Sequence, residues 1–200
     1  MRSIKTFLPR LIAILAAATP VAALAHTGAG HVEGFVQGVV HPFTGVDHML
    51  AMLAVGLLAG RMRGRAVWLL PTSFMALMAV GGLLGMASIA LPFVEVGIAC
   101  SLVVFGFLLA SSRDMTVAMT MALVGFCALF HGHAHGTEAA RDISGVGYEI
   151  GLLAATGILH SLGVAIALAS TRNERIAKRF LRISGGIVAL AGAGVLIGWM

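Results

Sequence analysis

Long apolar runs separated by short polar segments dominate this 200-residue chain. At 1.5 Å per residue in a helix, each run is long enough to cross a hydrocarbon layer of about 30 Å. The runs lack the alternation of a barrel strand, and only helices or closed barrels span lipid, so they predict transmembrane helices. The predicted spans cover residues 34–59, 66–91, 93–111, 115–137, 146–170 and 181–200.

Residues 1–25 have the pattern of a secretory signal peptide. This segment begins with basic residues, continues with a short apolar stretch and ends in Ala23-Leu24-Ala25, a small-residue cleavage site. An uncleaved first transmembrane helix is the alternative, although the apolar stretch is short for a span. We therefore expect a cleaved signal peptide at 1–25 and an all-α, polytopic domain of six transmembrane helices at 26–200.

Basic residues are concentrated on one side of the predicted bundle. Of the 13 Lys and Arg residues, three lie in the signal peptide, and Arg141 lies in a connection on the opposite side. The other nine lie in the connections after the first, third and fifth spans. They are Arg61, Arg63, Arg65, Arg113, Arg172, Arg175, Lys178, Arg179 and Arg182. By the positive-inside rule this side is cytoplasmic, which places both mature termini in the periplasm.

Composition supports an integral, multi-pass membrane protein. Hydrophobic residues make up 59% of the chain and charged residues 10%, and the mean hydropathy is +1.00. Soluble domains carry about 25% charged residues. The net charge of +5 follows from membrane orientation, so no nucleic-acid partner is expected. In such a chain, ionisable residues inside the spans are energetically costly and indicate functional sites.

Two polar stretches interrupt the apolar runs. The first is His41-Pro-Phe-Thr-Gly-Val-Asp47-His48, and the second extends from His131 to Glu138. In the predicted orientation, both stretches lie between the periplasmic face and the middle of the membrane. His131, His135 and Glu138 follow the i, i+4, i+7 pattern of one helix face, which His133 does not share.

Pro42 predicts a kink or break in the first span, because it removes a helical hydrogen bond and disfavours α geometry at His41. Along a regular helix, His41 and His48 would be about 10 Å apart, which is too far to bind one ion together. Each would then need a partner from another helix, or the two would serve as successive stations along one path. Asp47 could bind the ion itself or orient the ring of His48.

Imidazole and carboxylate groups suit divalent Ni, Co, Zn and Cu ions, and these ligand types alone do not select one of them. The candidate metal-binding residues are His41, Asp47, His48, His131, His135 and Glu138. The wider set adds His26, which signal cleavage would make the mature N-terminus, and Glu95, Glu149 and His160. We expect a transported ion rather than a permanently bound cofactor. The alternative is a polar network that holds the helices together.

At these residues the chain resembles the HupE/UreJ family of secondary nickel and cobalt permeases, over its full length. Its H-x5-D-H pattern is met at His41, Asp47 and His48, and its F-H-G-x-A-x-G-x-E pattern from Phe130 to Glu138. The resemblance implies nickel uptake for hydrogenase or urease maturation, with cytoplasmic nickel chaperones as partners. It implies that the three residues of the first pattern, together with His131 and Glu138, are required. The remaining two histidines of the second stretch fill variable positions.

The functional hypothesis is therefore facilitated uptake of a divalent metal ion, with Ni²⁺ as the first choice and Co²⁺ or Zn²⁺ as alternatives. Glu95, Glu138 and Glu149 would attract the cation at the periplasmic edge. No G-x-x-x-x-G-K-[ST] motif is present, so the chain has no ATPase of its own. An intramembrane zinc-dependent hydrolase is a rival, although H-E-x-x-H is absent. A membrane metal sensor or assembly factor is the third alternative.

Overall fold

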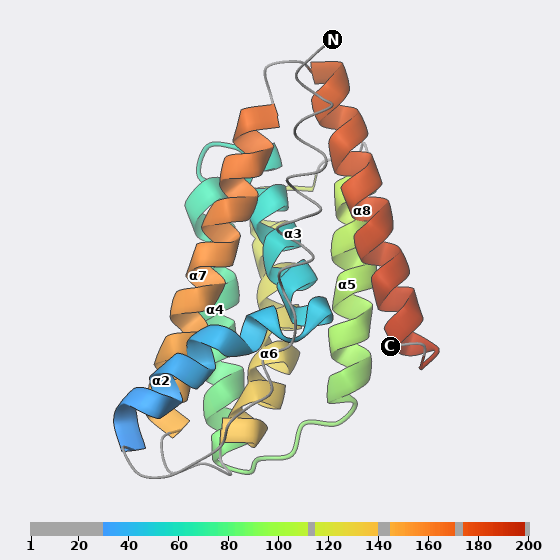
Figure 1. Cartoon of the computed structure of the whole chain (residues 1–200). Helices are drawn as coiled ribbons and strands as arrows, with labels where there is room; N and C mark the ends of the chain where they lie inside the picture. The colour runs from blue at the N-terminus through green and yellow to red at the C-terminus, as the bar shows by residue number, and fades with distance from the viewer. Residues whose placement is uncertain (1–29, 112–114, 140–144, 171–173, 199–200) are drawn as a thin grey trace.

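The computed structural model describes residues 30–111, 115–139, 145–170 and 174–198, with side chains from residue 34 onward. Every regular element in these segments is helical (Figure 1). In chain order they are α2 (Gly30–Val40), η1 (His41–Phe43), α3 (Val46–Met62), α4 (Ala66–Met86), α5 (Val94–Ala110), α6 (Val117–Ala139), α7 (Gly145–Ser170) and α8 (Glu174–Leu196). The all-α prediction is confirmed. The predicted signal peptide and His26 lie outside the described residues.

The helices have the length and apolar character of a multi-pass membrane protein. Four of them, α4, α6, α7 and α8, are long and apolar enough to cross a membrane. The pair of α2 and α3 passes the same test as one broken span, while α5 is shorter at 17 residues. The described residues therefore contain four to five candidate spans by this criterion, and the sixth crossing stays a prediction.

The first predicted span is broken at the position of Pro42. Its two parts, Gly34–Phe43 and Val46–Met62, are bent by 80°. Pro42 sits at the start of the short η1 turn, where Thr44 donates both its amide and its hydroxyl to the carbonyl oxygen of His41, at 2.9 and 2.7 Å. Gly45 is extended and forms the N-cap of α3. The predicted break is confirmed, and it sends α2 across the bundle instead of along it (Figure 1).

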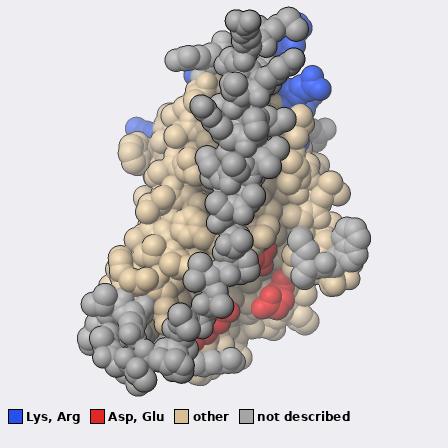
Figure 2. Space-filling model, viewed as in Figure 1, with Lys and Arg blue, Asp and Glu red and all other residues tan. Residues whose placement is uncertain are grey.

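Helix α8 begins at Glu174, whereas hydropathy placed its start at residue 181. The basic residues of this connection therefore continue the helix, which Lys and Arg do readily because their straight side chains lose little freedom. Lys and Arg gather at one end of the molecule, while acidic groups are seen towards the other end (Figure 2).

Glycines allow α4 and α6 to pack closely along their length. A Cβ atom at Gly132 would overlap the carbonyl oxygen of Met78, and one at Gly136 would overlap that of Gly82. In lipid, where no hydrophobic force drives helices together, such close approach supplies the van der Waals contact that holds them. Gly185 and Gly192 of α8 pack in the same way against the backbone of α5. Gly186 is the exception, since no described atom lies within 4 Å of its Cβ position.

Candidate metal centre

The bend after α2 and the polar face of α6 bring four imidazole rings together inside the bundle. The ring centroid of His135 lies 4.8 Å from that of His41 and 4.5 Å from that of His48. His131 lies one turn before His135 on α6, and its ring centroid is 5.2 Å from that of His48. Three of these side chains, His41, His48 and His131, occupy fixed positions of the two family patterns. The prediction that His131 and His135 share one face of α6 is confirmed.

One group has the donors for a metal ion. His41, His135 and Glu138 each offer one ligand atom, and these atoms lie within 4.8 Å of one another. Glu138 Oε2 lies 3.3 Å from His41 Nε2 and 3.8 Å from His135 Nδ1. An ion with bonds of about 2.1 Å separates neighbouring ligand atoms by roughly 3 to 3.4 Å. A small inward movement of these side chains would therefore suffice to bind it.

The predicted separation of His41 and His48 is wrong. Their ring centroids are 6.3 Å apart, because the chain turns at η1 rather than continuing as a regular helix. The two rings therefore belong to one cluster. Both contact His135, which fills a variable position of the family pattern yet lies at the centre of the cluster.

Hydrogen bonds fix which ring nitrogen carries the proton in His48 and His131. Ser101 Oγ donates to the carbonyl oxygen of Ile98 at 2.6 Å, so towards His131 Nε2, 2.8 Å away, it can only accept. Asp47 Oδ1 accepts from His48 Nδ1 at 2.9 Å, because a carboxylate only accepts. The lone pairs then lie on His131 Nδ1 and His48 Nε2, both buried and without a hydrogen-bond partner among the described residues.

This arrangement matches the way proteins prepare histidines for metal. A ligating imidazole donates its other N–H to a carboxylate or another acceptor, which fixes the tautomer and the ring orientation. The geometry thus favours an orienting role for Asp47, one of the two roles left open by the sequence. Asp47 also accepts from the backbone amide of His48 at 2.9 Å, in the first turn of α3, where a negative charge is stabilised.

Replacing Ser101 by alanine tests this arrangement. Without the hydroxyl, nothing holds the proton on His131 Nε2, and we expect Ni²⁺ affinity to fall about 10- to 100-fold while the fold is retained. Calorimetric titration of the purified full chain measures it. Ser161→Ala is the matched control, since that exposed hydroxyl only bonds the Gly157 carbonyl of its own helix. Equal affinities for both variants would contradict this role.

Buried polar atoms without hydrogen bonds gather in this region. Among the described residues they belong to His48, His131 and His135 of the cluster, and to Glu149 and His160 outside it. Each unpaired buried group costs about 1–3 kcal/mol. A network that served only to hold helices together would pair its members with one another. The concentration of unpaired donors and acceptors therefore favours a ligand site over the structural alternative.

The other predicted residues have different surroundings. Glu95 is exposed in the first turn of α5, and no contact with the cluster is seen in the part of the chain that the structure describes. Glu149 is buried, with its carboxylate against Gly82 of α4. His160 lies deeper in α7, and its ring contacts Phe74 at a centroid distance of 5.1 Å. His133 points away, as predicted, and its Nε2 lies 2.8 Å from the Ile89 carbonyl.

Sequence reasoning missed three neighbours of the cluster. Ser101 is a polar residue in the otherwise apolar stretch 96–110, a signal that could have identified it. Tyr148, the one tyrosine of the chain, places its ring 5.6 Å from that of His41 and its hydroxyl 3.5 Å from Glu138 Oε2. Phe74 contacts both His131 and His160 through its ring, at 5.7 and 5.1 Å, and an apolar residue in an apolar run gives no sequence signal.

A helical membrane bundle with imidazole and carboxylate groups converging between its helices has the features expected of a membrane protein that handles divalent transition-metal ions. A family model described as "HupE / UreJ protein" matches residues 13–195. The chain is 46% identical over 185 residues to "Protein HupE" of Rhizobium leguminosarum bv. viciae, covering 92% of this chain and 95% of that protein. No solved structure matches the chain significantly. The chain belongs to the HupE/UreJ family.

Membership sets the general class of activity. The family consists of permease-type membrane proteins, not enzymes, which sets aside the hydrolase alternative. It also implies a transport function of the nickel/cobalt type.

Proposed function

We propose that this chain carries Ni²⁺ into the cell by facilitated uptake, from the periplasm to the cytoplasm, across the bacterial inner membrane. The observation that carries the proposal is the convergence of His41, His135 and Glu138 within 4.8 Å, beside the rings of His48 and His131. Neutral nitrogen and carboxylate oxygen donors suit Ni²⁺, Co²⁺ and Zn²⁺ alike. The family relationship favours nickel or cobalt among these ions.

In this proposal the cluster acts as two adjoining stations. Glu138 is the most accessible member, with its side chain 55% exposed, and its charge attracts the cation towards His41 and His135. His48 and His131 receive the ion next, with their tautomers held by Asp47 and Ser101. No single station binds too tightly, because an ion must also leave.

Further inward, Phe74 separates the cluster from His160. The phenyl ring contacts both imidazoles, and in this proposal an ion that moves from His131 to His160 passes it. Both ring nitrogens of His160 are buried and lack hydrogen bonds among the described residues. His160 would then be the last imidazole before the basic end of the bundle.

Topology and driving force complete the proposal. The proposal includes a signal peptide at 1–25 and six spans, and under the positive-inside rule these would put the cluster near the periplasm and both termini outside. The membrane potential supplies about 2.3 kcal/mol per charge for each 100 mV, and cytoplasmic nickel chaperones would remove the product. The imported ion would supply hydrogenase or urease maturation.

Metal flux into empty proteoliposomes tests the function directly. We expect Ni²⁺ influx that Co²⁺ and Zn²⁺ inhibit to different extents, and loss of influx in His48→Ala and Asp47→Ala. His133→Gln is the matched control, because glutamine keeps the hydrogen bond to Ile89 and the residue lies outside the cluster. Full Ni²⁺ flux in both His48→Ala and Asp47→Ala would contradict the proposed mechanism. Stoichiometric binding without flux would indicate a metal sensor instead.

A further inference from the structure

A buried threonine on α7 forms a hydrogen bond to the sulfur of a buried methionine on α3. Thr156 Oγ1 donates to Met52 Sδ at 3.4 Å, and both side chains are completely buried. The hydroxyls of the other threonines in the described helices donate to carbonyl oxygens of their own helix, one turn earlier; these are Thr72, Thr120 and Thr137. Thr156 differs from them because its hydrogen bond joins two helices and holds a thioether in place.

The packing of α3 against α7 gives this pair a definite level in the bundle. Residues four apart on a helix are neighbours on one face. Met52 follows His48 by four positions on α3, and Thr156 precedes His160 by four positions on α7. A Cβ at Gly56, four positions after Met52, would overlap the carbonyl oxygen of His160, so the two helices run parallel in this register. The pair therefore lies one turn after His48 and one turn before His160.

The groups that surround this level differ in what they offer to an ion. Phe74 of α4 contacts the rings of His131 and His160, but a phenyl ring has no lone pair for a metal ion. The thioether of Met52 is an acceptor, and it keeps a lone pair that the hydroxyl of Thr156 does not use. Both ring nitrogens of His160 are buried without a hydrogen bond among the described residues, which indicates that a ligand reaches this depth.

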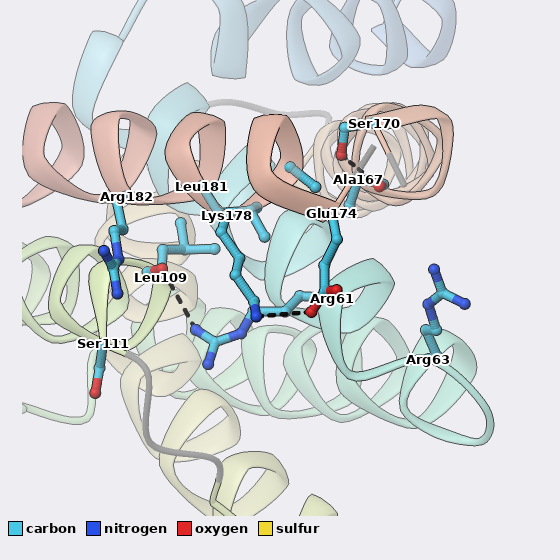
Figure 3. A pocket seen from close by; sticks show the side chains of 11 residues that line it. Arg61, Arg63, Leu109, Ser111, Ala167, Ser170, Glu174, Lys178, Leu181 and Arg182 are labelled. Carbon is cyan, nitrogen blue, oxygen red and sulfur yellow. Dashed lines mark hydrogen bonds and ion pairs between the residues drawn. The ribbon is translucent and has the colours of Figure 1, made fainter. Parts of the chain in front are cut away.

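Beyond His160, the same two helices reach a cavity of about 520 Å³ (Figure 3). Its lining includes Arg61 of α3 and Ala167 of α7. Along both helices, the pair of Met52 and Thr156 comes before this cavity and after the level of the cluster. This is the position of an intermediate step on a path through the bundle.

We propose that Met52 is a further metal ligand on this path, between the histidine cluster and His160, and that its thioether discriminates against hard divalent cations. Soft sulfur ligands favour the later transition metals, whereas Mg²⁺ and Mn²⁺ favour carboxylate, carbonyl and water oxygens. Thr156 is a positioning residue that holds the sulfur in place. A single weak donor suits a transport step, because the ion must also leave. The inference rests on the proposed uptake of Ni²⁺ and adds a selective step to it.

Influx of Ni²⁺ and of Mn²⁺ into proteoliposomes that contain the full chain tests the proposal. Met52→Leu nearly conserves the side-chain volume but removes the sulfur. We expect Ni²⁺ influx to fall about 10-fold, the lower end of the range for altered metal sites, while Mn²⁺ influx changes little. The Ni²⁺ affinity of the cluster, measured by calorimetry, should stay at the wild-type value. Met75→Leu is the matched control, because this half-buried thioether packs against Gly157, next to Thr156 in the chain.

The hydrogen bond is tested separately by Thr156→Val, which removes the hydroxyl, and Thr156→Ser, which keeps it. We expect a smaller loss of Ni²⁺ influx in the valine variant and recovery in the serine variant. Three results would overturn the inference: wild-type Ni²⁺ influx in Met52→Leu, an equal fall of Ni²⁺ and Mn²⁺ influx in that variant, or equal losses in Thr156→Val and Thr156→Ser. A wild type without Ni²⁺ influx would contradict the proposed function itself, and the inference with it.

Discussion

Replacing Glu138 by glutamine is expected to reduce Ni²⁺ uptake at least about 100-fold, beyond the usual loss from removing an orienting partner of a metal ligand. Glutamine keeps the shape and one acceptor oxygen but removes the negative charge. That charge lies 3.3 Å from His41 Nε2 and 3.8 Å from His135 Nδ1, and it is the carboxylate of the three-ligand group. A dication that leaves water there would lose its main electrostatic compensation.

Uptake in cells limited for other nickel importers measures this effect, with protein levels compared by immunoblot. Glu174→Gln is the control, because this exposed carboxylate pairs with Lys178 at the other end of the bundle. Calorimetry of purified Glu138→Gln should show a parallel loss of Ni²⁺ affinity. Wild-type uptake by Glu138→Gln at equal expression would show that the carboxylate is not a ligand.

Replacing Gly136 by leucine is expected to destabilise the bundle by at least about 3 kcal/mol, the upper range for overpacking a closely packed interface. A Cβ at this position already overlaps the carbonyl oxygen of Gly82, which is backbone and cannot rotate away. The side chain would force α4 and α6 apart. Because His135 is the adjacent residue on α6, we expect Ni²⁺ binding to be lost together with thermal stability.

Thermal unfolding of the purified protein, followed by size-exclusion chromatography after heating, measures the loss. Gly186→Leu is the matched control, since that helical glycine has no described atom within 4 Å of its Cβ position. We expect it to unfold at nearly the wild-type temperature. If Gly136→Leu were as stable as the control, the close contact of α4 with α6 would not be essential.

Much of the helical framework could be predicted from the sequence, because the residue pattern of a helix depends on positions that are close together in the chain. The break at Pro42 and the shared face of His131, His135 and Glu138 follow from the geometry of a single helix. The predicted distance between His41 and His48 was wrong because it, too, was calculated from the geometry of a single helix. It assumed a regular helix across the break, whereas the chain bends by 80° there.

The composition of the cluster could be predicted only in part. Ser101 reaches His131 across 30 positions of sequence, and Tyr148 reaches His41 from α7. The sequence pattern gave Glu95 and Glu149 the same predicted role, yet Glu95 is exposed and Glu149 is buried against Gly82. Such differences depend on how whole helices rotate and approach one another, and no local pattern records that.

The sequence alone determined that this chain is a helical membrane protein with imidazole and carboxylate donors in its spans, since hydropathy and residue chemistry do not depend on distant contacts. Only the tertiary structure decided that His135 stands at the centre and that His41 and His48 meet around it. Helix contacts between residues far apart in the chain, made close by glycines such as Gly136, select one arrangement among many that share the same local pattern.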